Sequence, residues 1–231
     1  MRIADMTWMQ VERYLEKDDR CVLPLGSTEQ HAYLSLAVDA ILSEKVAVDG
    51  AESLGVPVFP AVAYGLTPYF MAYPGTVTLT PETYGRVLTE VLGSLVQHGF
   101  RRVLIVNGHG GNREALPIVD EWAAQQSNLI VRWHDWWAAP RTLSAVREID
   151  PEASHASWME GFAWTRVEGV ELPAGHKATV DLTDRADLSP DGLRVRLGDG
   201  CFGGYYARPD EDLDDEWGVA VEETRLLIEE G

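Results

Sequence analysis

Six side chains of types that bind metal ions or transfer protons lie in three short segments of this 231-residue chain. GSTEQHAYLSLAVD offers Glu29, His31 and Asp39, NGHGGN offers His109, and SHASWME offers His155 and Glu160. Carboxylates and imidazoles together are typical ligands of Zn²⁺, Mn²⁺ or Fe²⁺. The glycines around His109 let the backbone approach a ligand or a metal ion closely. The pattern therefore predicts a metal site built from all three segments.

The elements before the first two segments explain how they could meet. Short apolar runs at 21–25 and 103–106 are typical of strands that are buried on both faces, and each ends where a polar segment begins. Ligands of open α/β sheets lie at the carboxyl ends of the strands. His155 and Glu160 are five residues apart, so a helix would not place them on one face. One of them could then face the metal while the other faces a substrate.

Strand and helix patterns alternate along the chain, which predicts an α/β protein: one domain over residues 1–231, with a mostly parallel β-sheet flanked by helices on both faces. The clearest helix spans 81–98, with Thr80 as N-cap, Pro81 at its first position and Gly99 after its end. The pattern also predicts helices over 46–54, 113–126, 155–169 and 214–230, strands over 56–65 and 129–133, and an irregular stretch over 171–204.

The charge balance excludes several classes of partner. Nineteen basic residues stand against 37 acidic ones, for a net charge of −18. A nucleic-acid-binding protein needs a basic surface, and anionic membranes repel an acidic one, so neither partner is expected. The first residues lack the apolar stretch of a signal peptide, and two cysteines cannot form a disulfide framework. These features predict a cytoplasmic protein.

The remaining histidines have structural explanations of differing strength. His98 fits the C-terminal end of a helix, where the helix dipole favours a cation. His176 is expected at the surface. His134 follows a predicted strand, and either a structural role or a place near the metal or in the substrate pocket fits its position.

The three segments, in this order, resemble the creatininase (creatinine amidohydrolase) family. PLGSTEQH is followed by an aspartate, then by NGHGGN about seventy residues later, and then by a His-Ala…Glu segment; YPGTVTL at 73–79 also resembles the family. The resemblance implies a parallel-sheet α/β fold, a centre with two divalent metal ions and an often hexameric homo-oligomer. It also implies hydrolysis of C–N bonds in cyclic amides, formamides or peptides.

Carried over residue by residue, the resemblance assigns metal ligation to Glu29, His31, Asp39, His109 and Glu160, and a place near the scissile bond to His155. Creatininase has a ligand glutamate two residues after the second-motif histidine, where this chain has Gly111. The first motif here, EQHAYLSLAVD, lacks the family's second histidine and is one residue shorter. Gly161 and Phe162 stand where the family has Thr-Ser.

Physical reasoning then predicts a mechanism and its alternatives. Asp39 would bridge two ions (Zn²⁺, or Mn²⁺ or Fe²⁺), with Glu29 and His109 on one ion and His31 and Glu160 on the other. A hydroxide between the ions would attack the amide carbon of a small-molecule substrate, and His155 would protonate the leaving nitrogen. Tyr33 and Trp136 are predicted to form the substrate wall. The alternatives are a peptide-trimming or deformylating enzyme and a non-catalytic metal-binding scaffold.

Overall fold

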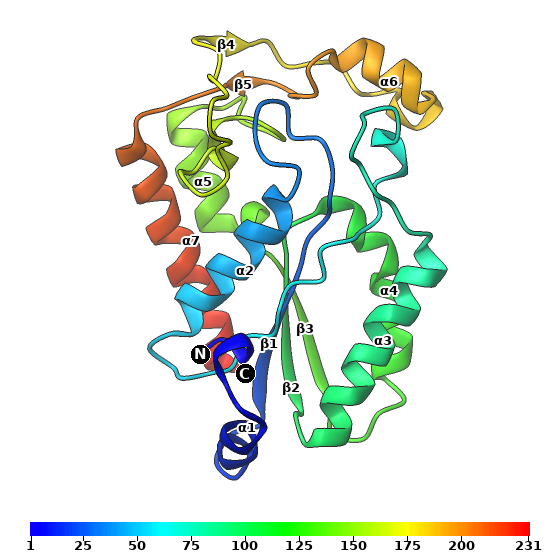
Figure 1. Cartoon of the computed structure of the whole chain (residues 1–231), viewed down its shortest axis with the longest axis vertical. Coiled ribbons are helices and arrows are strands. Elements are labelled where there is room, and N and C mark those ends of the chain that lie inside the picture. The colour runs from blue at the N-terminus through cyan, green and yellow to red at the C-terminus, as the bar shows by residue number, and fades with distance from the viewer.

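A parallel three-stranded sheet forms the centre of the protein, which a computed structural model describes over residues 1–231 (Figure 1). Its strands are β1 (Arg20–Leu25), β2 (Arg102–Asn107) and β3 (Ile130–Asp135), adjacent in that order. Leu25 pairs with Asn107, and Asn107 pairs with Asp135. All three strands therefore end level with one another, at the edge where the polar segments begin.

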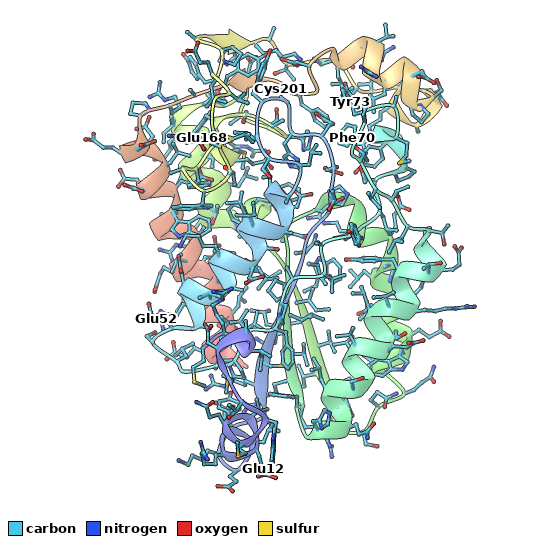
Figure 2. All side chains as sticks on the ribbon, in the orientation of Figure 1. Glu12, Glu52, Phe70, Tyr73, Glu168 and Cys201 are labelled. Atoms are coloured by element: carbon cyan, nitrogen blue, oxygen red, sulfur yellow. The ribbon has the colours of Figure 1, made fainter.

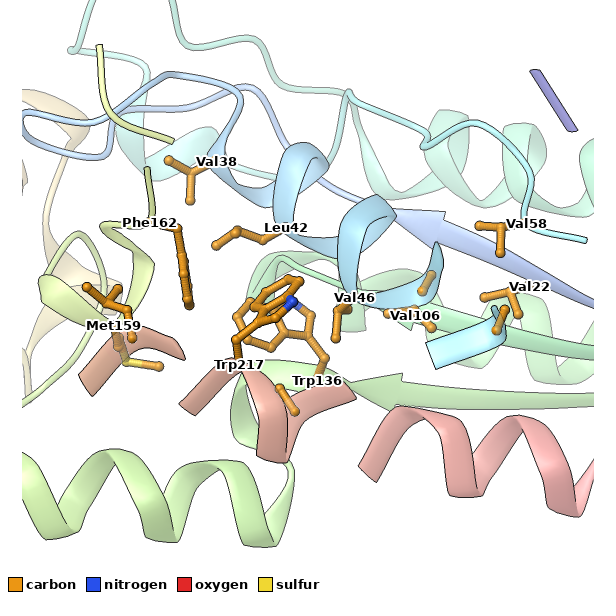
Figure 3. Packing of buried hydrophobic residues seen from close by; sticks show 14 of the residues in the cluster. Val22, Val38, Leu42, Val46, Val58, Val106, Trp136, Met159, Phe162 and Trp217 are labelled. Atoms are coloured by element: carbon orange, nitrogen blue, oxygen red, sulfur yellow. The ribbon is translucent and has the colours of Figure 1, made fainter. Parts of the chain in front are cut away.

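Helices cover both faces of this sheet, as predicted (Figure 1). One side holds α2 (Val38–Ala51), α5 (Pro140–Ile149) and α7 (Asp210–Glu230), and the other holds α3 (Pro81–His98) and α4 (Leu116–Ala123). Val22, Leu42, Trp136 and Trp217 belong to the core under α2 and α7 (Figure 3). A second core packs α3 against the opposite face. The two cores hold the strand ends in place, and the predicted α/β class is confirmed.

The helix predicted over 81–98 forms with those bounds because its end signals are local. The Thr80 hydroxyl accepts a hydrogen bond from the Thr83 amide at 3.3 Å, and Pro81 occupies the first helical position. Gly99 closes the helix with φ of 112°, a left-handed conformation that glycine adopts without strain.

Other predicted boundaries were wrong for identifiable reasons. The segment 56–65 forms only single bridges to β1, at Val58 and Val62, because Pro57 and Pro60 lack the amide hydrogens of a continuous ladder. The helix predicted over 155–169 is one 3-10 turn, Trp158–Glu160. The helix predicted over 46–54 is the C-terminal part of α2. The helix predicted over 113–126 is the 3-10 turn η3 (Gly110–Ala115) followed by α4, and the helix predicted over 214–230 begins at Asp210.

The periodicity did not reveal several short elements. These are α1 (Trp8–Leu15), α5, α6 (Pro190–Leu197), β4 (His176–Lys177), β5 (Gly204–Tyr205), and the 3-10 turns Ile3–Asp5, Pro68–Phe70, Trp136–Ala138 and Arg185–Asp187. The stretch predicted to be irregular contains α6, which packs through Leu193 and Leu197 on Phe70 and Tyr73. Figure 2 shows Phe70, Tyr73 and Cys201 at the end of the molecule opposite Glu12. This stretch thus covers the end where the strands terminate. No helix combines the length and apolar composition that a membrane crossing requires.

Candidate metal centre

The predicted ligands converge beyond the carboxyl ends of β1 and β2. Glu29 and His31 lie on the loop after β1, Asp39 lies in the first turn of α2, and His109 follows β2. Glu160 comes from the 3-10 turn far along the chain. All five side chains are buried. Their ligand atoms form a first triad of Glu29, Asp39 and His109 and a second triad of His31, Asp39 and Glu160, each with its atoms within 4.8 Å of one another.

In the first triad, a histidine lone pair faces two carboxylates. The Nε2 atom of His109 lies 2.9 Å from the Leu66 carbonyl oxygen, to which it donates, so Nδ1 of the neutral ring carries no hydrogen. That Nδ1 lies 3.2 Å from Glu29 Oε1 and 3.1 Å from Asp39 Oδ2. Three electron-rich atoms facing one another at these distances require a cation between them, or a second proton on the ring.

The second triad repeats this arrangement. His31 Nδ1 donates to the Glu29 carbonyl oxygen at 3.2 Å, which leaves Nε2 3.0 Å from Asp39 Oδ1 and 3.9 Å from Glu160 Oε2. His31 Nε2 and Asp39 Oδ2 are buried and have no hydrogen-bond partner. Buried polar atoms are almost always satisfied, so these two atoms fit a site that takes a metal ion.

The electrostatics of the site favour positive charge. Burial alone would lower the pKa of His31, but the adjacent Asp39 carboxylate outweighs it and raises that pKa to about 10. Burial likewise opposes protonation of His109, whose pKa Glu29 and Asp39 hold well above its usual value. Burial raises the pKa of Glu160 to about 7. Divalent ions can supply the positive charge that extra protons would otherwise bring.

The NGHGGN segment shapes the loop that carries His109. The Asn107 amide donates to the His109 carbonyl oxygen at 2.7 Å and to Asp135 Oδ1 at 2.6 Å, and the Asn112 amide donates to Asn107 Oδ1 at 3.0 Å. A Cβ atom on Gly108 would lie 2.4 Å from the Asp39 carbonyl oxygen. Only glycine therefore lets α2 approach β2 closely enough to bring Asp39 to His109.

The space around Gly111 leaves no room for a ligand side chain at that position, and Glu160 supplies the second carboxylate of the second triad instead. A Cβ atom at position 111 would lie 2.0 Å from the Leu66 carbonyl oxygen and 2.5 Å from His109 Nε2, so a glutamate does not fit there. Glu160 is held in place instead, because its Oε2 accepts a hydrogen bond from the Ala156 amide at 2.6 Å.

His155 lies at the edge of both triads. Its Nδ1 is 3.9 Å from Glu29 Oε1, and its ring stacks on Phe70 with centroids 5.1 Å apart. Its Nε2 lies 2.9 Å from the Gln30 side-chain nitrogen and 3.0 Å from the Gln30 carbonyl oxygen. Burial is the main reason why the pKa of His155 is well below its usual value. A neutral ring can accept a hydrogen bond from the amide, and a protonated ring can donate to the carbonyl, so Gln30 offers a partner to either form.

A cavity of about 360 Å³ opens onto the triads. Besides Glu29, Asp39, His109, His155 and Glu160, its walls include Tyr69, Phe70, Trp137, Leu143, Arg147, Met159, Arg185 and Phe202. Sequence reasoning missed most of these wall residues, because they come from irregular segments or from helices without a clear pattern.

The two predicted substrate-wall residues do not line this cavity. Trp136 is buried in the core with its ring 5.8 Å from that of Trp217, and the next residue, Trp137, faces the cavity instead. The 3-10 turn after β3 decides which of the two tryptophans points outward. Tyr33 lies outside the cavity wall, and its ring packs edge-on against Tyr206 at 5.7 Å.

The other histidines have structural surroundings. His134 is buried, with Nε2 3.0 Å from the Thr224 hydroxyl of α7, and burial lowers its pKa to about 4. Of the two alternatives for His134, this contact favours the structural one. His98 is exposed at the end of α3, and His176 is an exposed residue with Nε2 3.3 Å from both Asp150 and Glu152.

The motifs and this geometry agree with a comparison against known families. A family model described as creatininase, creatinine amidohydrolase, matches residues 4–164. The chain belongs to the creatininase family. Creatinine amidohydrolase of Pseudomonas putida is 31% identical over 118 residues, 48% of this chain and 45% of that protein. The mycofactocin precursor peptide peptidase of Mycolicibacterium smegmatis is 38% identical over 102 residues, 41% of each chain.

A third relative and the solved structures extend this comparison. The 3-dehydro-scyllo-inosose hydrolase of Thermotoga maritima is 33% identical over 107 residues, 46% of this chain and 34% of that protein. The matched regions thus span less than half the length of each of these curated relatives. A crystal structure of creatinine amidohydrolase matches 99% of this chain and 96% of its own with a TM-score of 0.82 at 22% identity. A Bacteroides fragilis structure described as a putative creatinine amidohydrolase matches with a TM-score of 0.75 at 22% identity. That match covers 100% of this chain and 95% of the other. At these identities, the structural matches establish the family fold.

Proposed function

We propose that this protein is a metal-dependent hydrolase of C–N bonds in amides, cyclic amides or formamides. One observation carries the proposal: the two oxygens of Asp39 face different histidines, Oδ1 toward His31 at 3.0 Å and Oδ2 toward His109 at 3.1 Å. A carboxylate placed in this way can give one oxygen to each of two ions. Glu29 and His109 would complete one ion's ligands, and His31 and Glu160 the other's.

The choice of metal follows from the ligands and from the relatives. Mixed nitrogen and oxygen donors suit Zn²⁺, Mn²⁺ or Fe²⁺. Among the solved relatives with this fold, one mutant creatininase is described as of Zn-Zn type and another structure as creatininase with Mn. Two divalent ions bound here would supply a water of lowered pKa and polarise a carbonyl oxygen.

The chain's own residues complete the hydrolysis. Water adds to the carbonyl carbon, the C–N bond breaks, and the nitrogen departs with a proton. His155, whose lowered pKa keeps the ring neutral, is placed to take a proton from the attacking water and deliver it to that nitrogen, because its Nδ1 faces the triads while Gln30 holds its Nε2. Phe70 and Phe202 flank the ring, with centroids 5.1 Å and 4.8 Å from that of His155, and leave its side chain 16% exposed, toward the cavity.

Two alternatives remain to be separated from this proposal. Peptide trimming is suggested by the name of the Mycolicibacterium smegmatis relative, and a deformylase would use the same groups. A non-catalytic scaffold would bind metal without turnover. A homo-oligomer, a hexamer by resemblance to the family, stays a prediction, and sedimentation of the purified chain as a monomer at micromolar concentration would reject it.

The deciding experiment combines metal counting with a substrate panel. The purified protein, loaded with Zn²⁺ or Mn²⁺, is assayed with cyclic amides, formamides and short peptides. We expect two ions per chain and hydrolysis that chelation abolishes. Two bound ions with no turnover of any of the three classes would favour the scaffold. Chelation should also lower the melting temperature, since an ion at a hundredfold excess over its Kd stabilises the fold by ~2.7 kcal/mol.

A further inference from the structure

Two arginines line the cavity without a carboxylate partner in the chain. Arg147 comes from α5 and Arg185 from the 3-10 turn Arg185–Asp187, and neither forms an ion pair. Nine other arginines form ion pairs, for example Arg20 with Asp18 at 2.6 Å and Arg225 with Glu222 at 2.8 Å, and five do not, but none of those five lines this cavity. With 37 acidic residues in the chain, partners are plentiful. Two guanidinium groups left unpaired at one cavity therefore point to a ligand that brings negative charge.

An aromatic side chain next to the metal centre holds Arg185. Its guanidinium carbon lies 3.9 Å from the centroid of the Tyr69 ring, a cation–π contact. The Tyr69 hydroxyl in turn lies 3.2 Å from His109 Nε2. One tyrosine ring thus separates Arg185 from a ligand of the first triad. A guanidinium that lies over an aromatic ring keeps the N–H donors at its edge available for an oxyanion.

Arg147 reaches the same cavity from a different wall. It lies one helical turn after Leu143 on α5, and both side chains line the cavity. Trp137, which precedes α5 in the chain, lines the cavity with these two residues and adds an apolar side chain. In Figure 1, α5 and the segment before α6 lie at the same end of the molecule, around the loops that carry the ligands. The two positive charges therefore approach the cavity from separate elements.

The charge of the cavity differs in sign from that of the chain. Glu29, Asp39 and Glu160 bring three negative charges, and two divalent ions would bring four positive ones. Adding Arg147 and Arg185 makes the loaded cavity positive, within a protein of net charge −18. A local positive field in a cleft attracts anions and raises their association rate.

We propose that Arg147 and Arg185 bind an oxyanion of the substrate, a carboxylate or a phosphate, at a distance from the C–N bond that is cut. The inference rests on the proposed hydrolase function and adds the substrate class: a small anionic amide. The cavity volume of about 360 Å³ suits such a compound. The arginines act on binding and orientation, and the triads and His155 act on the bond.

Three matched probes test this: N-formyl-β-alanine, its neutral amide N-formyl-β-alaninamide, and N-formyl-2-aminoethyl phosphate. All three present the same formamide and differ in the distant group. We expect the metal-loaded enzyme to bind at least one anionic probe about tenfold or more tightly than the neutral one, as charge-assisted hydrogen bonds allow. The two anionic probes decide between carboxylate and phosphate. Equal affinity for all three would overturn the proposal.

Variants show whether the arginines cause the preference. Arg147→Gln and Arg185→Gln should each lose most of it, through a higher KM for the anionic probe with kcat and the neutral probe little changed. Arg141→Gln, an exposed position on the same helix, is the control and should keep it. If both cavity variants keep the wild-type preference, the anion binds to the metals alone and the inference is wrong.

A binding measurement separates this inference from the proposed function. Quenching of tryptophan fluorescence reports occupancy of the cavity, because Trp137 lines it, and needs no turnover. If no probe is hydrolysed but the anionic preference depends on Arg185, the anion site stands and formamide hydrolysis fails. If hydrolysis occurs without any anionic preference, the function stands and the anion site fails.

Discussion

The first and second triads share Asp39 but are built in different ways. Glu29 and His109 of the first triad lie on the loops that follow β1 and β2, and the Asn107 network fixes the loop of His109. The second triad depends on Glu160, which comes from a single 3-10 turn in an irregular segment and is held by one amide hydrogen bond. If each triad binds an ion, the ion at the first triad would be held at the edge of the sheet, and the ion at the second would depend on the loop of Glu160. We expect the second position to be the easier one to empty.

The largest loss of metal and of activity should come from a change at Asp39, the residue that both triads share. Asp39→Asn replaces one carboxylate oxygen by an NH2 group and removes the negative charge, so the proposed bridge should be lost. Both ions should then be released and kcat should fall at least about a thousandfold, because two-metal hydrolysis needs both ions. Elemental analysis and steady-state kinetics measure this. Asp120→Asn, an exposed position on α4, is the control. Two ions per chain in Asp39→Asn would show that Asp39 does not bridge.

A smaller loss of activity should come from a change at His155, which lies outside both triads. His155→Ala should keep two ions and lower kcat by ~10²–10⁴, as expected for a positioned proton donor. The loss should shrink for substrates with better leaving groups, which need less protonation. If His155 only packs against Phe70 and Phe202, kcat would hardly change and stability would fall by ~1 kcal/mol. Loss of a metal ion would instead make His155 a ligand, which its 4.8 Å grouping with Glu29 and His31 permits.

The difference between the triads is tested directly by two matched variants. Glu160→Gln should weaken one metal position by at least about tenfold, and excess metal should partly restore activity. Glu29→Gln should be harder to rescue, because the first triad is held by the strand ends. Metal titrations of both variants followed by activity compare them. Equal rescue would mean that the loop and the sheet edge hold their ions equally well.

The smallest effect concerns a buried carboxylate behind the second triad. Glu216 of α7 is 1% exposed, and neither of its oxygens has a hydrogen-bond partner. Burial, and then repulsion from Glu160, hold the pKa of Glu216 well above its usual value. The folded state therefore keeps a proton that the unfolded state releases above about pH 4.5.

The stability contributed by this proton is full below the unfolded pKa and is lost as pH rises through the folded pKa. Glu216→Gln should therefore match the wild type near pH 4 and exceed it near pH 8, because each unit by which the folded pKa of Glu216 lies above the unfolded one costs the wild type about 1.4 kcal/mol there. Denaturant unfolding at both pH values measures this. A variant less stable than wild type at pH 8 would show that Glu216 is ionised and paired in the folded protein.

The sequence predicted the sheet and the ligand cluster because both depend on local signals. The apolar runs before Glu29 and His109 end at the same edge, and parallel pairing then brings those residues together. The two triads contain the predicted ligand pairs, while the metal roles themselves stay predictions. Trp136 and Trp137 could not be told apart, because the conformation of the 3-10 turn Trp136–Ala138 decides which of the two side chains faces inward. Arg185 carried no signal, since its segment has no periodicity and its place depends on packing against Tyr69.

The late position of Glu160 in the chain has a consequence for folding. An ion held by His31, Asp39 and Glu160 would join parts of the chain separated by more than a hundred residues. Both cysteines are buried and free, so no covalent link restrains these parts. A cross-link that closes a loop of about 100 residues can remove as much as ~4.7 kcal/mol of chain entropy from the unfolded state. A metal ion at the second triad would thus act as a reversible cross-link, which forms when metal is supplied and is lost when metal is removed.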